Sequence, residues 1–452
     1  MSESREKMAI IGAGPVGLGM ARALKVHGIP YDQFEADDDI GGNWYHGVYS
    51  TTHTISSRNV TQYPEYPMPA QYPDYPSREQ VLAYLRDYAR HFALVGDITF
   101  NTKVVMARPR SDQLWEVTLG SGETRIYKGV VVSNGHDWSR RYPQYPGVFA
   151  GEYMHSKDYK RPEQLAGRRV LVIGAGNSAS DIACEAARVG TSSDVSMRRG
   201  YWFVPKILFG KPFHEAFPLA TPIWLHRLLL RLVLKIAVGD YRRYGLRRPE
   251  HKLFTSVPTI SSELLHYLRH GRITPRPDVA RYDGHRIEFV DGSSGSYDLV
   301  VCATGFHLEF PFLPKGMIPV RDGVAPLYGG AVPQDLRHLY ITSATHPIYG
   351  FGPPITAGAD LLATLIPLQD RIELPLGRVL KACGMKPAST HLLHPASALR
   401  ELRWARRLLP VIVPFVERRL RRTIDRKMGR ASSAPTANET ASESLNPDMT
   451  VY

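Results

Sequence analysis

The sequence is poor in cysteine and has no local arrangement of metal ligands. Only three cysteines occur among its 452 residues, Cys184, Cys302 and Cys383. They lie far apart and form no CxxC pair, so we expect neither a disulfide framework nor a zinc or other metal site. The lack of a CxxC pair also argues against a redox-active disulfide. This cysteine usage is typical of a protein in a reducing compartment.

The sequence also lacks an apolar leader and any signature of nucleic-acid binding. Its first ten residues, MSESREKMAI, are charged and run directly into a strand-like segment, so we expect a cytoplasmic rather than a secreted protein. The net charge is +13, of which residues 400–430 carry +8. No zinc-finger, RRM-like or helix-turn-helix pattern accompanies this charge, so we expect no nucleic-acid partner.

A first glycine-rich turn follows a short apolar segment near the N-terminus. In MAIIGAGPVGLGMARAL, which starts at Met8, a strand-like run leads into Gly12, Gly14 and Gly17 and then into a helix-compatible run. This GxGxxG arrangement binds the pyrophosphate of a dinucleotide at the start of the helix. Glu35 follows about 20 residues later, where an acid accepts hydrogen bonds from the ribose hydroxyls. The pattern predicts a nucleotide site without a 2′-phosphate.

A second copy of this pattern begins at Arg168. RRVLVIGAGNSASDIACEAARV contains Gly174, Gly176 and the small residue Ala179 at the same spacing. No acid follows at the expected distance, and Arg198 and Arg199 stand there instead. Guanidinium groups pair with a 2′-phosphate that an acid would repel, so the second site is predicted to prefer NADPH over NADH. The alternative is a solvated surface pair of arginines.

Two dinucleotide sites in one chain predict two doubly wound α/β domains and an electron relay. The hydride of NADPH would pass to a second cofactor, for which FAD is the natural acceptor. The apolar strands around Val130 and Val301 are both expected to rejoin the first sheet, which makes the second domain an insertion. The expected segments are a first FAD-binding part (1–160), an NADPH-binding domain with a helical insertion (161–296), a second FAD-binding part (297–395), a basic helical segment (396–430) and a disordered tail (431–452).

The stretch FAGEYMHSKDYK lies just before the second glycine motif. Phe149, Gly151, His155 and Tyr159 match FxGxxxHxxx(Y/F), the fingerprint of the flavin-containing monooxygenases, which the chain therefore resembles. The resemblance covers roughly residues 8–315 and includes four further motifs in order. These are GGNW with Gly42 and Trp44, SNGH at 133–136, the GNS with Asn177 and Ser178, and CATGF with Thr304 and Gly305.

The resemblance implies an enzyme that uses FAD, NADPH and O₂ to oxygenate a small organic molecule. In this family NADPH reduces FAD, oxygen adds at flavin C4a, and the hydroperoxide transfers one oxygen atom to a nitrogen- or sulfur-containing nucleophile. The glycine motifs and the residues Glu35, Gly42, Trp44, Thr304 and Gly305 would then hold FAD. Because the reagent forms on the cofactor, no acid–base pair is required of the protein. We expect His155 to be a hydrogen-bonded orienting residue rather than a general base.

Two positions bear on the type of oxygenation. The family usually has Thr-Asn over the flavin, whereas this chain has Thr54 followed by Ile55. The missing amide allows weaker oxygen transfer, with an uncoupled NADPH oxidase that produces hydrogen peroxide as one alternative. Tyr159 stands where the related Baeyer–Villiger monooxygenases of the larger type usually carry tryptophan, which favours heteroatom oxidation and leaves ketone oxygenation as the nearest rival.

Two basic, apolar segments are candidates for contact with an anionic membrane surface. Between Trp224 and Val238, Arg227, Arg231 and Lys235 recur every four residues and predict a basic stripe on a helix. The segment at 396–430 brackets an apolar stretch with arginines, and its two prolines are expected to break it into short helices. The alternative is that the first helix covers the active site and the second packs on the flavin domain.

Overall fold

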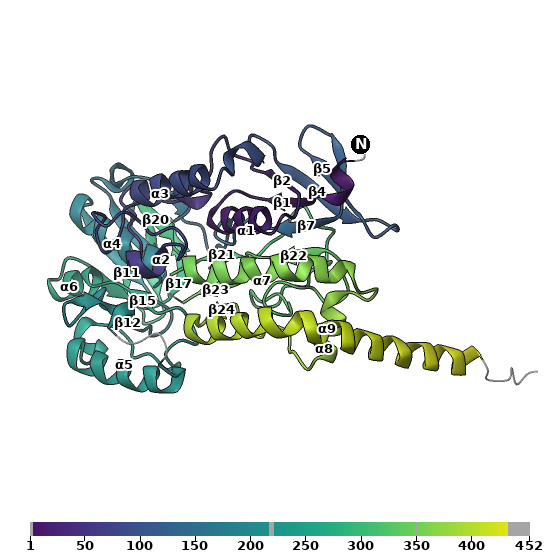
Figure 1. Cartoon of the computed structure of the whole chain (residues 1–452). Helices are drawn as coiled ribbons and strands as arrows, with labels where there is room; N and C mark the ends of the chain where they lie inside the picture. The colour runs from purple at the N-terminus through teal and green to yellow at the C-terminus, as the bar shows by residue number, and fades with distance from the viewer. Residues whose placement is uncertain (1–2, 217–220, 349, 433–452) are drawn as a thin grey trace, which may run out of the picture.

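Two α/β units and a long C-terminal helix make up the molecule (Figure 1). The computed structural model describes residues 3–216, 221–348 and 350–432. Each unit is built on a five-stranded parallel sheet. Helix α9 (Pro395–Ser432) runs along the lower side of the molecule and extends beyond it.

The first sheet has the strand order β22-β7-β1-β2-β3. Its strands are β1 (Met8–Ile11), β2 (Tyr31–Phe34), β3 (Ile98–Thr99), β7 (Gly129–Val132) and β22 (Leu339–Ile341). All neighbouring strands are parallel. β1, β7 and β22 are buried along their whole length, as expected for strands covered on both faces. The main helices of this unit are α1 (Pro15–Val26), α3 (Arg78–His91), α7 (Gly352–Asp370) and α8 (Leu376–Ala382).

The second sheet has the order β16-β11-β10-β20-β9 and is also parallel throughout. Its strands are β9 (Glu152–His155), β10 (Arg169–Ile173), β11 (Ser192–Ser196), β16 (Thr274–Arg276) and β20 (Leu299–Cys302). The helices of this unit are α4 (Asn177–Val189), α5 (Ile223–Ala237) and α6 (Glu263–Arg269). Two Rossmann-like domains were predicted from the glycine motifs, and the fold class is confirmed.

The two units share one topology. In each sheet, the strand that leads into the glycine motif is central and is followed by a helix and a second parallel strand. A three-stranded antiparallel sheet precedes the strand that returns to the centre. These small sheets are β4 (Val104–Pro109), β5 (Trp115–Leu119) and β6 (Thr124–Tyr127) in the first unit, and β17 (Val279–Asp283), β18 (Arg286–Phe289) and β19 (Ser294–Ser296) in the second.

One expectation about this topology is wrong. The strand at 299–302 was expected to rejoin the first sheet, but β20 pairs with β10 and β9 in the second sheet. The strand pairs of the second unit therefore run from 152 to 302, beyond the expected limits of 161 and 296 on both sides. A fully buried apolar strand fits beside the central strand of either sheet, so its composition does not decide between them.

Helix α3 begins at a polar cap residue. Ser77 is the N-cap, its side chain accepts a hydrogen bond from the backbone of Gln80, and the Gln80 side chain bonds the Ser77 backbone in return. This capping box satisfies two backbone N–H groups that would otherwise lack partners at the helix start.

The C-terminal helix is continuous, which corrects the expectation that its prolines break it. α9 runs through Pro410 and Pro414 without interruption. Leu409 and Val413 on this stretch are buried in the core cluster that also contains residues of α7 and α8. This packing outweighs the loss of the two backbone N–H donors. Of the predicted tail, residues 433–452 lie outside the described residues.

The remaining strands and the helix α2 are short. They are α2 (Arg58–Thr61), β8 (Ser139–Arg140), β12 (Phe203–Val204), β13 (Ile207–Leu208), β14 (Lys211–Pro212), β15 (Thr259–Ile260), β21 (Phe306–His307), β23 (His346–Pro347) and β24 (Leu392–Leu393). Within the described ranges, no helix combines the length and apolarity needed to cross a bilayer.

Candidate cofactor and active site

A cavity of about 1380 Å³ is lined by loops of both units. Residues 11–20 and 34–37 of the first unit contribute to its wall, and so do Asn177, Ser178 and Asp181 at the start of α4 in the second. Residues of α7 and the inner face of α9 complete it. The carboxyl ends of parallel strands are where α/β folds bind their ligands, and both glycine motifs lie at such ends.

The first glycine motif forms an open cradle for a phosphate. Gly12 has a φ of +102°, and a Cβ there would lie 2.6 Å from the backbone oxygen of Ser133. A Cβ at Gly17 would collide with the carbonyl oxygen of Gly12, because helix and strand pack closely there. Gly14 differs, since the nearest atom to its Cβ position is 3.8 Å away on Gly42.

Gly14 is the N-cap of α1, and no side chain caps this helix start. The backbone N–H groups of a helix's first turn need partners from outside the helix, and a phosphate group supplies them. Gly42, with a φ of +54°, and Trp44 line the cavity beside this point. The cradle therefore fits the pyrophosphate of FAD.

Glu35 lies at the end of β2 and lines the cavity, as the ribose-binding acid should. It is 7% exposed, and its Oε2 accepts a hydrogen bond from the backbone N–H of Ala13 at 2.5 Å. Its Oε1 accepts another from Asp37 at 3.1 Å. Burial raises the pKa of this carboxyl, and the backbone hydrogen bonds oppose that shift. These bonds orient the carboxylate at the cavity wall, where a diol could use its remaining lone pairs.

The second glycine motif repeats the geometry of the first. Gly174 has a φ of +143°, and a Cβ there would collide with the carbonyl oxygen of Ala303. Gly176 is the uncapped N-cap of α4, and nothing lies within 4 Å of its Cβ position. Asn177 and Ser178 line the cavity, and the Asn177 Oδ1 accepts a hydrogen bond from the backbone of Ile260 at 2.8 Å. This cradle fits a second pyrophosphate.

The two arginines beyond β11 are exposed, and Arg199 lines a separate pocket of about 250 Å³. Its guanidinium lies 5.2 Å from the centre of the Tyr201 ring. Arg247, which no sequence pattern marked, lines the same pocket. In the part of the chain that the structure describes, neither Arg198 nor Arg199 forms an ion pair. Both guanidinium groups are therefore available to an anion.

The fingerprint residues pack the crossing between the two units rather than lining the cavity. A Cβ at Gly151 would lie 2.6 Å from the carbonyl oxygen of Asp298, so the close approach of β9 to its neighbour requires glycine. Phe149 packs against Tyr282 with ring centres 6.0 Å apart. Tyr159 is fully buried against Tyr49, at 5.3 Å between ring centres.

His155 uses both of its ring nitrogens in hydrogen bonds. Nε2 lies 3.0 Å from the carbonyl oxygen of Gly305, and Nδ1 accepts the backbone N–H of Lys157 at 3.1 Å. Because a carbonyl only accepts, Nε2 carries the proton of the neutral ring. Burial lowers the pKa of His155. This arrangement suits an orienting residue and leaves no nitrogen for a substrate proton.

Thr54 and Ile55 both line the cavity. Thr54 is 3% exposed, and its Oγ1 has no hydrogen-bond partner among the residues that the structure describes. A buried hydroxyl normally has a partner, so a polar group of a bound cofactor or a water fits here. Ile55 is partly buried and packs against the core of the second unit.

Thr304 and Gly305 are not brought to the cavity wall, although they were predicted to bind FAD. Arg141 donates from Nε to the Thr304 carbonyl at 2.9 Å, and the Thr304 hydroxyl bonds the backbone of Arg141. Gly305 accepts from His155. The short antiparallel pair β8–β21 holds both residues at the crossing between the units. These contacts indicate that the CATGF motif joins the units.

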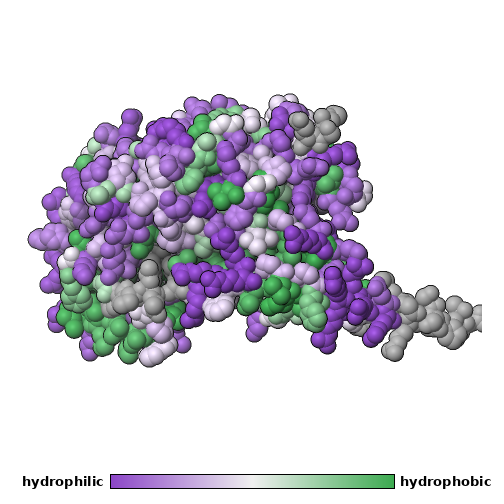
Figure 2. Space-filling view, in the orientation of Figure 1, coloured by the Kyte–Doolittle hydropathy of each residue, from purple (hydrophilic) through white to green (hydrophobic). Residues whose placement is uncertain are grey.

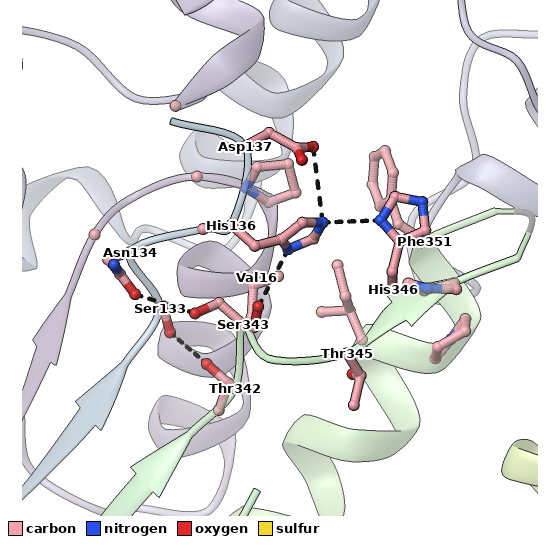
Figure 3. A pocket seen from close by; sticks show the side chains of 18 of the residues that line it. Val16, Ser133, Asn134, His136, Asp137, Thr342, Ser343, Thr345, His346 and Phe351 are labelled. Atoms are coloured by element: carbon pink, nitrogen blue, oxygen red, sulfur yellow. Dashed lines mark hydrogen bonds and ion pairs between the residues drawn. The ribbon is translucent and has the colours of Figure 1, made fainter. Parts of the chain in front are cut away.

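A histidine pair in the cavity wall was not identified from the sequence (Figure 3). His136 Nε2 and His346 Nδ1 are 2.9 Å apart, and His136 Nδ1 lies 3.1 Å from the carbonyl oxygen of Ser343. That carbonyl requires a proton on His136 Nδ1, so His346 Nδ1 donates to the neutral His136 ring. Desolvation, aided by His136, lowers the pKa of His346 to about 4.

Three further polar side chains, Lys157, Tyr49 and Asp181, line the cavity without a sequence signal that marked them. Lys157 Nζ bonds the Asn43 side chain and the Asp137 carbonyl oxygen, the latter at 3.1 Å. Burial, and secondarily Lys160, lowers the pKa of Lys157 to about 8. Tyr49 donates to Asp181 Oδ2 at 2.7 Å, and burial raises the pKa of this aspartate.

Comparison with known proteins places the chain in a family. The model of the flavin-binding monooxygenase-like family matches residues 5–403. The chain belongs to this family. It is 31% identical over 361 residues to dimethylaniline monooxygenase [N-oxide-forming] 2 of Oryctolagus cuniculus, which covers 74% of this chain and 67% of the relative. Flavin-containing monooxygenase 5 of Homo sapiens is also 31% identical, over 74% of this chain and 68% of its own length.

Solved structures share the fold. The S-allyl-L-cysteine S-oxygenase of Allium sativum superposes with a TM-score of 0.65 at 22% identity and covers 94% of both chains. The closed form of cyclohexanone monooxygenase has a TM-score of 0.70 at 18% identity, over 90% of this chain and 97% of that one. Family membership confirms that this protein is an oxidoreductase of the flavin monooxygenase type, with FAD and NADPH as its cofactors.

Proposed function

We propose that this protein is an NADPH-dependent FAD monooxygenase that inserts one atom of O₂ into a small nitrogen- or sulfur-containing nucleophile. One observation carries the proposal: the two phosphate cradles, at Gly14 and at the start of α4 after Gly176, meet at one large cavity. This arrangement suits hydride transfer between two bound dinucleotides, because the reacting rings must approach each other closely.

The residues of the chain bind and orient the cofactors. The uncapped starts of α1 and α4 would each receive a pyrophosphate, and Glu35 would hold the FAD ribose. Arg198 and Arg199 would pair with the 2′-phosphate of NADPH. When bound, FAD would supply the hydride acceptor for NADPH and the means to activate O₂, with one oxygen atom going to the substrate and the other to water.

The second task of the chain is to exclude water from the reacting atoms. Apolar side chains form much of the cavity wall, including Ile55, Phe351, Leu361, Leu362, Leu365 and Leu409. Dry surroundings suppress the side reaction with water that yields hydrogen peroxide. Polar groups of the wall, Thr54 and the pair His136–His346 among them, would fix orientation through hydrogen bonds.

The choice of heteroatom substrates over ketones rests on Tyr159. Tyr159 is buried in the core of the second unit and does not line the cavity. The preference for heteroatom substrates therefore depends on the resemblance to the family and not on a contact with the substrate. The two solved neighbours support both chemistries: one is named as an S-oxygenase and the other as a cyclohexanone monooxygenase. Baeyer–Villiger oxygenation of a ketone is therefore the second candidate function.

An uncoupled NADPH oxidase is the third candidate, and Ile55 is the observation that favours it. An isoleucine in the cavity wall supplies no hydrogen bond where the family usually has an amide. Oxygen would then be released as hydrogen peroxide instead of reaching a substrate.

A single set of assays separates the three candidates. NADPH oxidation, oxygen consumption and hydrogen peroxide are measured together with a thioether, a tertiary amine or a cyclic ketone as probe. The proposal expects a sulfoxide or an N-oxide to form in proportion to NADPH consumed. Formation of lactone alone would favour the second candidate. Conversion of all consumed oxygen to peroxide with every probe would favour the third.

A further inference from the structure

Helix α5 carries a row of exposed apolar side chains on the face opposite its buried face. Its buried face consists of His226, Leu230 and Leu234. Four large apolar residues recur at steps of four on the opposite side and are exposed by 66%, 50%, 52% and 87%: Trp224, Leu228, Leu232 and Ile236. At 3.6 residues per turn this stripe lies about 180° from the buried face. The stripe is therefore at least half exposed along its whole length.

Cations follow one edge of this stripe. Arg227, Arg231 and Lys235 also recur at steps of four, between the apolar stripe and the buried face. Arg227 donates to the carbonyl oxygen of Leu253 at 2.8 Å, and Arg231 and Lys235 are exposed. None of the three forms an ion pair with a residue that the structure describes.

The helix α9 has the same design. Its inner face is buried through Leu409 and Val413. Its outer face carries five exposed apolar residues over three turns: Trp404, Leu408, Val411, Ile412 and Phe415. Trp404, Val411 and Phe415 are exposed by 57%, 74% and 70%. Large apolar side chains exposed in a contiguous group mark a site of interaction.

Arginines bracket the α9 stripe at both ends. Arg403 lies just before the stripe, and Arg407 lies in its first turn. Arg418, Arg419 and Arg422 follow the stripe. All five arginines are exposed. The arginines that turn toward the protein are paired instead: Arg406 with Asp360 at 3.0 Å, and Arg421 with Glu373. The outward arginines form no ion pair within the described ranges. The outer face of α9 is therefore apolar at its centre and cationic at its ends.

The two stripes lie on the same side of the molecule. α5 and α9 both run along the lower margin in Figure 1, and Figure 2 shows apolar surface over both. An apolar stripe with cations beside it, a tryptophan at its start and a buried opposite face is the pattern of a helix that lies in the plane of a membrane interface.

We infer that this side of the protein docks on an anionic lipid bilayer through the apolar stripes of α5 and α9. The charges decide between this surface and a second copy of the chain. Two copies in contact would bring the segment 400–430, with its charge of +8, against itself. Anionic headgroups neutralise these cations while the acyl boundary receives the apolar side chains.

Docking in this way brings the cavity close to the lipid. Leu402, Ala405 and Leu409 on the inner face of α9 line the cavity, whereas Trp404 and Leu408 lie on its outer face. One wall of the cavity is therefore a single helix, about 10 Å across, from the docking surface.

Sedimentation with lipid vesicles tests the inference on the full-length holoenzyme. The vesicles contain either phosphatidylcholine alone or phosphatidylcholine with phosphatidylglycerol. We expect binding to the anionic vesicles that weakens as salt is raised. The variant R418Q/R419Q/R422Q should weaken this binding by about a hundredfold, at about fivefold for each cation removed. The variant W404S/F415S should also weaken it, by tenfold or more, because less apolar surface enters the interface.

The matched control replaces exposed apolar residues elsewhere. Val26 and Val148 are exposed by 62% and 78%, and V26S/V148S should bind vesicles like the unmodified protein. Flavin content and NADPH oxidation verify that each variant is folded. Absence of binding to anionic vesicles at low salt overturns the inference, as does equal binding by all variants. If the parent protein is a dimer that does not bind vesicles, and W404S/F415S is a monomer, the exposed face contacts a second copy of the chain. That result also overturns the inference.

Discussion

Replacing Gly176 by alanine should damage the second cofactor site without damaging the fold. Gly176 has φ and ψ of −77° and −176°, which any residue adopts, and its Cβ position has no atom within 4 Å. The fold therefore accepts the new methyl group, and the change at the N-cap costs at most about 1 kcal/mol of unfolding free energy. The space that the methyl group fills is the space that a pyrophosphate needs.

The size of the effect follows from the contact that is lost. A charge-assisted hydrogen bond from a helix-start N–H to phosphate contributes about 1.5–3 kcal/mol. G176A should therefore raise the KM for NADPH by about 10- to 150-fold. Flavin content should not change, because Gly14 and the FAD cradle belong to the other unit.

G174A is the matched control. A residue with a side chain is strained at its φ of +143°, and the Cβ would collide with Ala303. This variant should lose thermal stability as well as NADPH binding. The assays are thermal unfolding, flavin absorbance and steady-state kinetics with NADPH. A KM for G176A within about twofold of the parent value, in a folded protein, would refute the assignment of the second cradle.

Three further predictions address the selectivity, the coupling and the stability of the enzyme. R199Q should raise the KM for NADPH by about tenfold or more and leave that for NADH nearly unchanged, since only NADPH has the 2′-phosphate; equal changes for both coenzymes would contradict the assigned role. I55N should lower the fraction of NADPH that ends as hydrogen peroxide, because the amide adds a hydrogen-bonding group to the cavity wall; an unchanged or higher fraction would contradict this reason. The pKa of His346 is lowered to about 4 from its ordinary 6.5, so the unfolded chain binds more protons between these values and the free energy of unfolding should fall as pH drops from 6.5 to 4. In denaturant titrations across this pH range, the free energy of unfolding of H346Q should fall less steeply than that of the parent protein. Parallel pH profiles for the two proteins would count against the buried histidine as the cause.

The local features of both cradles could be predicted from the sequence because they depend on neighbouring residues. The positive φ of Gly12 and Gly174 and the open positions of Gly14 and Gly176 follow from one strand, one turn and one helix. The start of α3 at Ser77 is local in the same sense.

Features that depend on distant contacts could not be predicted in this way. The strand at 299–302 has the composition of a buried parallel strand, but only its pairing with β10 shows which sheet it joins. The prolines at 410 and 414 are poor helix residues, yet burial of Val413 holds the helix together through them. Tertiary packing overrides local preference at both places.

The cavity wall combines both kinds of feature. Glu35 could be predicted from its distance to the glycine motif, whereas the pair His136–His346 joins residues that are 210 positions apart. Thr304 and Gly305 follow a motif but lie at the crossing between the units instead of at the cavity. A motif identifies a family position, and the surrounding backbone determines what that position contacts.

Anaerobic titration of the purified holoenzyme with NADPH tests the central claim most directly. If the two cradles hold FAD and NADPH at one cavity, the protein is yellow as isolated or after addition of FAD, and one equivalent of NADPH bleaches one equivalent of flavin. A colourless protein that FAD does not reconstitute, or a bound flavin that NADPH leaves oxidised, would contradict the account.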